Sequence, residues 1–176
     1  MRTETITRNL YKFEELSDDA KDKAIEKLWD INVDYDWWGW TYADAKEVGL
    51  ELTGFDIDRG SYCKGAFIDT AEHTAKKIIK NHGDTCETYK DAQNYLKDLE
   101  IAIAENLEEN ADCEYPEDYL DTEEIDNDFL KELLEDYRII LQNEWDYLTS
   151  REAIIETIES NEYDIVTGKQ IGRAHV

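Results

Sequence analysis

Alternating apolar and polar residues predict a β-hairpin between residues 49 and 69. Two alternating runs are separated by DRGS at 58–61, which has the composition of a turn. In the first run the apolar residues before Gly54, Leu50 and Leu52, have even numbers. Those after it, Phe55 and Ile57, have odd numbers. A one-residue shift exchanges the two faces of a strand. We therefore predict a β-bulge at Gly54, where the missing side chain tolerates the irregularity.

An isolated hairpin is marginally stable in water and needs a third strand or a helix on its apolar face. The segment Thr3–Phe13 is rich in β-branched and aromatic residues, which favour strands. We expect it to form the third strand of the same sheet. A short edge strand is also expected at 163–166.

Helical spacing and capping residues dominate the rest of the chain. Helices are expected after Ser17, from Asp34 to Gly49, from Thr70 to Gly83, after Thr85, from Thr122 to about 148, and after Ser150. The predicted fold class is α+β: mostly helical, with a small antiparallel sheet made of the hairpin at 50–68 and the N-terminal strand, packed by amphipathic helices. Residues 1–169 are expected to form a single acidic domain with an acidic loop at about 108–121.

The final residues, QIGRAHV at 170–176, resemble a translated sequencing adapter. The codons CAG-ATC-GGA-AGA-GCA-CAC-GTC encode this string and match the opening of a common adapter. We expect this segment to be a non-native tail, and we exclude it from functional reasoning.

The chain carries 44 acidic and 19 basic residues, for a net charge of −25. A nucleic acid would be repelled by such a surface, because affinity for its backbone comes mainly from cationic contacts. The same charge favours a basic protein partner.

There is no apolar run near the roughly 20 residues that span a bilayer and no signal peptide, and three cysteines indicate a reducing compartment. The expected location is the cytoplasm.

The negative charge is concentrated in residues 105–136, which hold 15 carboxylates and one base, Lys131. One interpretation is a mimic of a nucleic-acid backbone, because carboxylates three or four residues apart on a helix lie about 5–6 Å apart. The other is a solvated helix face with an acidic loop, the usual role of charge runs. The residues assigned to partner contact are Glu105, Glu108, Glu109, Asp112, Glu114, Glu117, Asp118, Asp121, Glu123, Glu124 and Asp128, together with Trp37, Trp38 and Trp40.

The three tryptophans belong to a dense aromatic cluster between Trp29 and Tyr42. Core packing is one interpretation. Successive residues of a helix turn by about 100°, so the tryptophans cannot all point one way. At least one is therefore expected to be exposed, where tryptophan is a preferred interface anchor.

Two sets of residues are alternative candidates for metal binding, one for magnesium and one for zinc. Asp56 and Asp58, with Asp69 across the hairpin, have the carboxylate chemistry of a magnesium-dependent nuclease or phosphotransferase, although the D-x-D spacing is weakly specific. His82 and Cys86, with Cys63 or Cys113, contain zinc-ligand residue types but lack paired C-x2-C spacing. We assign no metal site and no cofactor, and interpret His82 as a packed residue near a helix end.

The run YKFEELSDDAK at 11–21, followed by INVDYDWW, GFDIDRGSYCKGAFID and HGDTCETYK, resembles a family of small acidic proteins from phages and mobile elements of gut bacteria. The resemblance extends to about Glu162. It implies a phage or plasmid origin and a bacterial host cell. The family is uncharacterised, so no catalytic residue is carried over.

Three hypotheses follow. The leading one is a non-enzymatic inhibitor of a host defence nuclease, of the anti-restriction or anti-CRISPR type, acting by nucleic-acid mimicry on a basic host protein. The alternative is a metal-dependent enzyme that uses Asp56, Asp58 and Asp69. The third is a phage structural or regulatory protein that forms a homodimer through the helix at 122–148.

Overall fold

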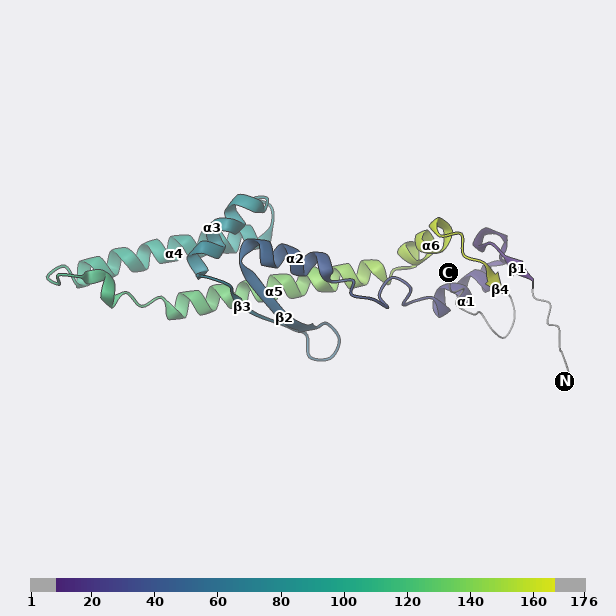
Figure 1. Ribbon diagram of the computed structural model, residues 1–176, viewed down its shortest axis with the longest axis horizontal. Coiled ribbons are helices and arrows are strands. Elements are labelled where there is room, and N and C mark those ends of the chain that lie inside the picture. The colour runs from purple at the N-terminus through teal and green to yellow at the C-terminus, as the bar shows by residue number, and fades with distance from the viewer. Residues whose placement is uncertain (1–8, 167–176) are drawn as a thin grey trace, which may run out of the picture. The chain divides into compact units, whose positions relative to one another are not determined.

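The computed structural model describes residues 9–166 (Figure 1). Helices predominate and the strands are antiparallel, so the fold is α+β as the sequence predicts. In chain order the elements are β1 (Leu10–Tyr11), η1 (Phe13–Glu15), α1 (Asp18–Lys27), α2 (Gly39–Val48), β2 (Leu50–Asp56), β3 (Tyr62–Phe67), α3 (Ala71–Asn81), α4 (Glu87–Glu109), η2 (Pro116–Tyr119), α5 (Glu123–Leu148), α6 (Arg151–Ser160) and β4 (Ile165–Val166). The start of the expected N-terminal strand and the tail at 170–176 lie outside the described residues.

The described chain divides into two compact units. We call Trp38–Gln142 the central unit, and residues 9–37 together with 143–166 the terminal unit. Helix α5 belongs to the central unit up to Gln142, and its last residues belong to the terminal unit. Each unit has its own apolar core. The single domain over 1–169 stays a prediction.

The hairpin of β2 and β3 is in the central unit. Leu52 is opposite Gly65, whereas Gly54 is opposite Lys64, so Thr53 is the extra residue of a bulge. The change of apolar parity across Gly54 is therefore confirmed as a bulge beside that residue. Before the bulge, Leu50 and Leu52 turn into the core.

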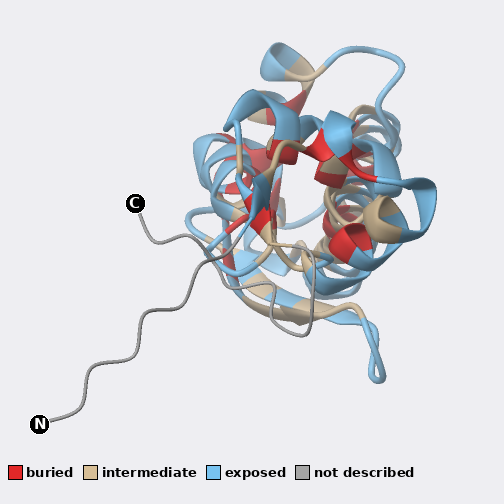
Figure 2. Ribbon diagram, turned by 90° about the vertical axis from the view of Figure 1, so that its right-hand side faces the viewer, coloured by how far each residue is buried: buried red, intermediate tan, exposed pale blue. Residues whose placement is uncertain are grey.

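Helices cover the apolar face of this hairpin. Helix α2 ends at Gly49, whose φ of 98° is the left-handed conformation that favours glycine. The Phe129 ring on α5 stacks on Phe67 of β3 at 5.8 Å and on Tyr95 of α4 at 4.4 Å. Figure 2 shows buried positions on the inward sides of the helices and exposed positions outside. The buried core of the unit consists of Ala45, Val48, Leu50, Leu52, Ala71, Ala75, Ile78, Ala92, Tyr95, Leu99, Phe129, Leu133 and Tyr137.

The terminal unit contains a second small sheet, in which β1 pairs antiparallel with β4. The Lys12 ammonium, directly after β1, lies 2.9 Å from the Asp164 carboxylate. The buried side chain of Asn32 donates to the Leu148 carbonyl at 3.0 Å and accepts from the Thr157 hydroxyl at 2.7 Å. The core residues of this unit are Phe13, Leu16, Ala24, Ile25, Ile154, Ile158 and Ile165.

Two predictions from the sequence are wrong in detail. The described part of the N-terminal strand, Leu10–Tyr11, pairs with Ile165–Val166 and not with the hairpin. Alternation of apolar and polar residues indicates a strand but does not specify its partner. The helix expected from Asp34 begins at Gly39, after a turn in which the Trp37 ring packs on Trp145 at 5.5 Å. The segments predicted to cap helices, 69–72 and 149–152, do contain the N-caps of α3 and α6. The capping residue is the second of each segment: the hydroxyls of Thr70 and Ser150 accept from the backbone amides of His73 and Ala153.

Over residues 9–166, no helix combines the length and the apolarity needed to cross a membrane.

The close approach of backbone at Gly65 gives a test of the hairpin packing. A Cβ atom there would lie 2.5 Å from the Glu51 carbonyl oxygen and 3.1 Å from a Leu134 methyl carbon. Because both neighbours are held by packing, Gly65→Ala is expected to lower the free energy of unfolding by about 1–3 kcal/mol in urea denaturation. The matched control is Gly39→Ala, where a Cβ meets nothing within 4 Å. Equal stability of Gly65→Ala and the unmodified protein would contradict this packing.

Candidate functional site

The candidate site is the end of the α4–α5 helical hairpin, which we define as residues 105–124 and call the acidic hairpin end (Figure 1). Side-chain amides tie its loop to α4. The Asn106 amide donates to the Pro116 carbonyl at 2.8 Å, and the Asn110 amide donates to the Asn106 carbonyl at 3.0 Å. At the other end of the loop, the Asp121 carboxylate accepts from the Glu123 backbone amide at 3.0 Å, in a local turn where α5 begins. The loop between the helices is therefore anchored at both sides.

All eleven carboxylates assigned to partner contact, from Glu105 to Asp128, are exposed. Over residues 9–166 none of them forms an ion pair. Glu105, Glu108 and Glu109 lie three and four residues apart on α4, so they share one side of that helix. The negative charge is thus presented to solvent without a compensating cation from residues 9–166.

Exposed apolar side chains accompany these carboxylates. Tyr115 and Tyr119 in the loop are 57% and 64% exposed, and Leu107 on α4 is 48% exposed. None of these three residues was predicted as a contact from the sequence, although two tyrosines within a highly acidic loop are a signal of a binding surface. Together with the carboxylates they form a mixed surface of negative charge and aromatic rings.

The three assigned tryptophans have different environments. Trp37 is buried at 5% exposure, and Trp38 packs on the Phe55 ring with centroids 5.5 Å apart. Trp40 is 85% exposed. The expectation that at least one tryptophan is exposed is confirmed at Trp40. Trp37 is packed inside and belongs to the terminal unit, so the three do not make one contact surface.

The fold does not bring together the three aspartates that were considered as a magnesium site. The Asp56 carboxylate accepts from the Asp58 backbone amide at 2.8 Å, which is a turn contact, and Asp58 lies 3.7 Å from the Arg59 guanidinium. Asp69 lies 3.2 Å from the His73 ring instead. Within the described part of the chain, no group of three or more His, Cys, Asp or Glu side chains has an arrangement that could hold a metal ion.

His82 belongs to a polar network at the edge of the core rather than to a zinc site: its own side chain is largely covered, whereas its partner Asp44 is half exposed. Its Nδ1 atom is 2.8 Å from the Thr88 hydroxyl, and its Nε2 atom is 3.5 Å from the Asp44 carboxylate. Tyr137 donates to the same carboxylate at 2.8 Å. The His82 contact and then the Tyr137 hydrogen bond hold the pKa of Asp44 below its ordinary value. The interpretation of His82 as a packed residue is confirmed by its 11% side-chain exposure.

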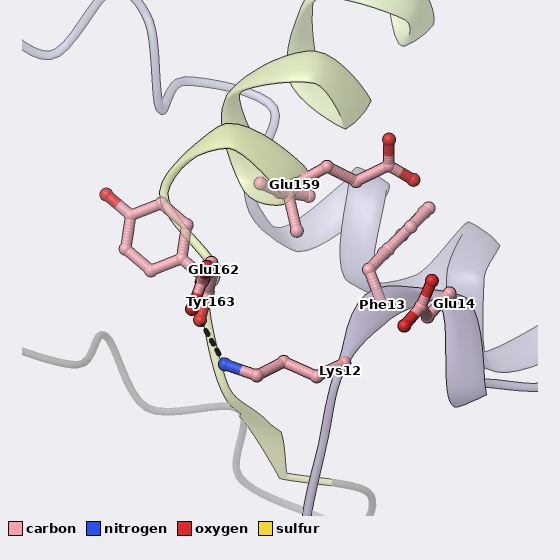
Figure 3. Close-up of a pocket in the computed structure, with 7 residues that line it drawn as sticks. Lys12, Phe13, Glu14, Glu159, Glu162 and Tyr163 are labelled. Carbon is pink, nitrogen blue, oxygen red and sulfur yellow. Dashed lines mark hydrogen bonds between the residues drawn. The ribbon is translucent and has the colours of Figure 1, made fainter.

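A cavity of about 440 Å³ in the terminal unit was not anticipated from the sequence. Figure 3 shows the Phe13 ring between the Glu14 and Glu159 side chains, with Tyr163 on another wall. The Lys12 ammonium donates to the Glu162 carbonyl at 2.6 Å, and its contact with Asp164 raises the pKa of Lys12. The ammonium is therefore already paired.

No family model matches the chain, and neither the curated proteins nor the solved structures gave a match.

The Asp44 network predicts a stability difference that depends on pH. Because the folded pKa of Asp44 is depressed, its carboxylate stabilises the fold above the unfolded value of about 3.9, and this contribution is lost as pH falls through the folded pKa. Because half of the Asp44 side chain is exposed and solvent screens its contacts, Asp44→Asn should lower the free energy of unfolding by only about 0.5 kcal/mol at pH 7, and by less below about pH 4. Urea denaturation at both pH values measures this. Glu47→Gln, on the exposed side of the same helix, is the control, and an equal loss in both variants at pH 7 would contradict the network.

The three cysteines are expected to differ in reactivity. Burial raises the pKa of the Cys63 thiol to about 11, whereas Cys86 and Cys113 are exposed. Because the thiolate is the nucleophile, iodoacetamide at pH 8 should modify Cys63 at least about tenfold more slowly than the other two. Peptide mass spectrometry over a time course measures the three rates. The difference should vanish in 8 M urea, and equal rates in the folded protein would overturn the prediction.

Proposed function

We propose that this protein is a non-enzymatic, phage-encoded inhibitor that presents the acidic hairpin end to the basic nucleic-acid groove of a host defence nuclease. The inhibitor would be of the anti-restriction or anti-CRISPR type and would act by nucleic-acid mimicry. The observation that carries the proposal is the set of eleven exposed carboxylates that have no ion pair among residues 9–166.

The spacing of these charges supports mimicry. Carboxylates three or four residues apart on a helix lie about 5–6 Å apart, and phosphates along one strand of a duplex rise by about 3.4 Å each. Both arrays repeat negative charge every few ångströms along an ordered backbone. A groove lined with lysine and arginine would attract either array.

The exposed aromatic residues support a protein as the partner. Tyrosine and tryptophan are enriched among the residues that dominate binding energy at protein interfaces. Tyr115 and Tyr119 lie within the acidic loop, so they can supply apolar contact where the charges supply attraction. Trp40, on α2 of the central unit, is a second candidate contact.

The proposal is tested by capture and displacement. The immobilised protein is incubated with bacterial lysate at low salt, and bound proteins are eluted by duplex DNA or by a salt gradient. The DNA eluate is expected to contain a nuclease whose cleavage activity falls when the free protein is added back. Failure of DNA to displace the captured proteins, or undiminished cleavage, would contradict mimicry.

Four glutamates of the acidic hairpin end should be required for inhibition. We expect the variant with Glu105, Glu108, Glu109 and Glu117 all changed to Gln to raise the concentration for half-inhibition at least tenfold, because it removes four contacts with the groove. The control changes Glu14, Glu26, Glu156 and Glu159 to Gln, which removes the same charge from exposed positions in the terminal unit. A similar loss of inhibition in both variants would show that only net charge matters. No loss of inhibition in either variant would refute the assigned site.

A further inference from the structure

A cavity of about 330 Å³ lies between α4 and α5 in the central unit. This volume is at the lower end of the range of about 300–1,000 Å³ that is typical of ligand pockets. The most buried side chains that line it are apolar: Tyr95 and Phe129, whose rings stack with centroids 4.4 Å apart, and the half-buried Ile125. The cavity therefore has an apolar floor.

Carboxylates from both helices form the rim of this cavity. Asp98 comes from α4, whereas Asp128 and Glu132 come from α5, and all three are exposed. Asp128 and Glu132 are four residues apart, so they lie on the same side of α5. Asn94, one turn before Asp98, adds an amide oxygen that can accept a hydrogen bond. The rim thus offers acceptors from two sides.

The charge of the rim is not balanced by a close cation. Within residues 9–166, none of the three rim carboxylates forms an ion pair. The pKa of Glu132 is raised, first by partial desolvation and then by neighbouring carboxylates, and Lys131 opposes this shift. These neighbours are Asp91, Asp128 and Asp98. The rim carboxylates therefore repel one another, and a bound cation would relieve that repulsion.

The arrangement of the rim favours an organic cation. Among the described residues, no three His, Cys, Asp or Glu side chains could together hold a metal ion, so these carboxylates surround the cavity without converging on one point. An arginine side chain joins an apolar stem to a planar guanidinium with five N–H donors. The stem suits the apolar floor, and the donors can reach acceptors on both helices. A lysine ammonium is more compact and has three donors.

We propose that the cavity between α4 and α5 binds an arginine side chain of the basic partner, with its guanidinium held by Asp98, Asp128 and Glu132. The identity of the partner rests on the proposed function, whereas the binding of a guanidinium does not. Arginine is favoured for phosphate recognition, so a basic nucleic-acid groove supplies it. The cavity is also near the acidic hairpin end, because Asp128 is four residues after Glu124.

The guanidinium site is tested on the unmodified protein alone. N-acetyl-arginine amide is titrated into the ¹⁵N-labelled protein, and the backbone amide shifts are followed by NMR. Saturable shifts are expected to be concentrated at residues 94–98 and 125–132. N-acetyl-lysine amide carries the same charge, and its Kd should be at least about threefold higher because its ammonium cannot span the two helices.

Variants of the cavity should change the affinity for the arginine probe in opposite directions. The variant that combines Asp98→Asn, Asp128→Asn and Glu132→Gln should raise the Kd at least about tenfold, because it removes the charged acceptors. Lys97 also lines the cavity. Lys97→Gln should lower the Kd, because it removes an ammonium that repels the probe.

The matched control changes Glu14, Glu26 and Glu156 to Gln, which removes the same three charges from exposed positions in the terminal unit. This control should retain the Kd of the unmodified protein. Both triple variants then enter the nuclease inhibition assay. There the cavity variant should require at least about a fivefold higher concentration for half-inhibition than the control.

The outcomes separate the cavity from the proposed function. Shifts that do not saturate or that spread over all acidic surfaces, or equal affinity for the two probes, would overturn the guanidinium site, and this result needs neither a variant nor a nuclease. Binding of the arginine probe together with equal inhibition by the two triple variants would overturn the partner's arginine as the occupant. If no nuclease is inhibited at all, the proposed function fails and the probes still decide the cavity.

Discussion

The stack of Phe67, Phe129 and Tyr95 is the contact on which the central unit depends. It joins the hairpin to α5 and α5 to α4, so one column of rings fixes three elements. Burial of aromatic rings supplies much of the driving force in cores. In this chain that force must also offset the repulsion of a net charge of −25. Packing of the rings can offset this repulsion because the fold places most carboxylates on outward faces, where water screens them, and leaves the inward faces apolar.

Charge and apolar packing therefore occupy different parts of the same two helices. Toward the loop, α4 and α5 carry exposed carboxylates with no ion pair among the described residues. Along their contact they bury Ala92, Leu99 and Leu133. The hydrogen bond from Tyr95 to Asp126, 2.6 Å long, lies where these two regions meet, so even a carboxylate near the core obtains a donor there. The proposed partner surface thus lies at the end of two helices that pack against each other, with part of its carboxylates on the helices and part in the loop between them.

Local patterns predicted much of this fold, and contacts distant in sequence explain what they did not predict. The parity change across Gly54 and the capping segments at 69–72 and 149–152 depend on neighbouring residues, so they could be predicted from the sequence. The partner of the N-terminal strand is more than 150 residues away, and period-two alternation carries no information about partners. The exposed carboxylates were predicted as a set from composition.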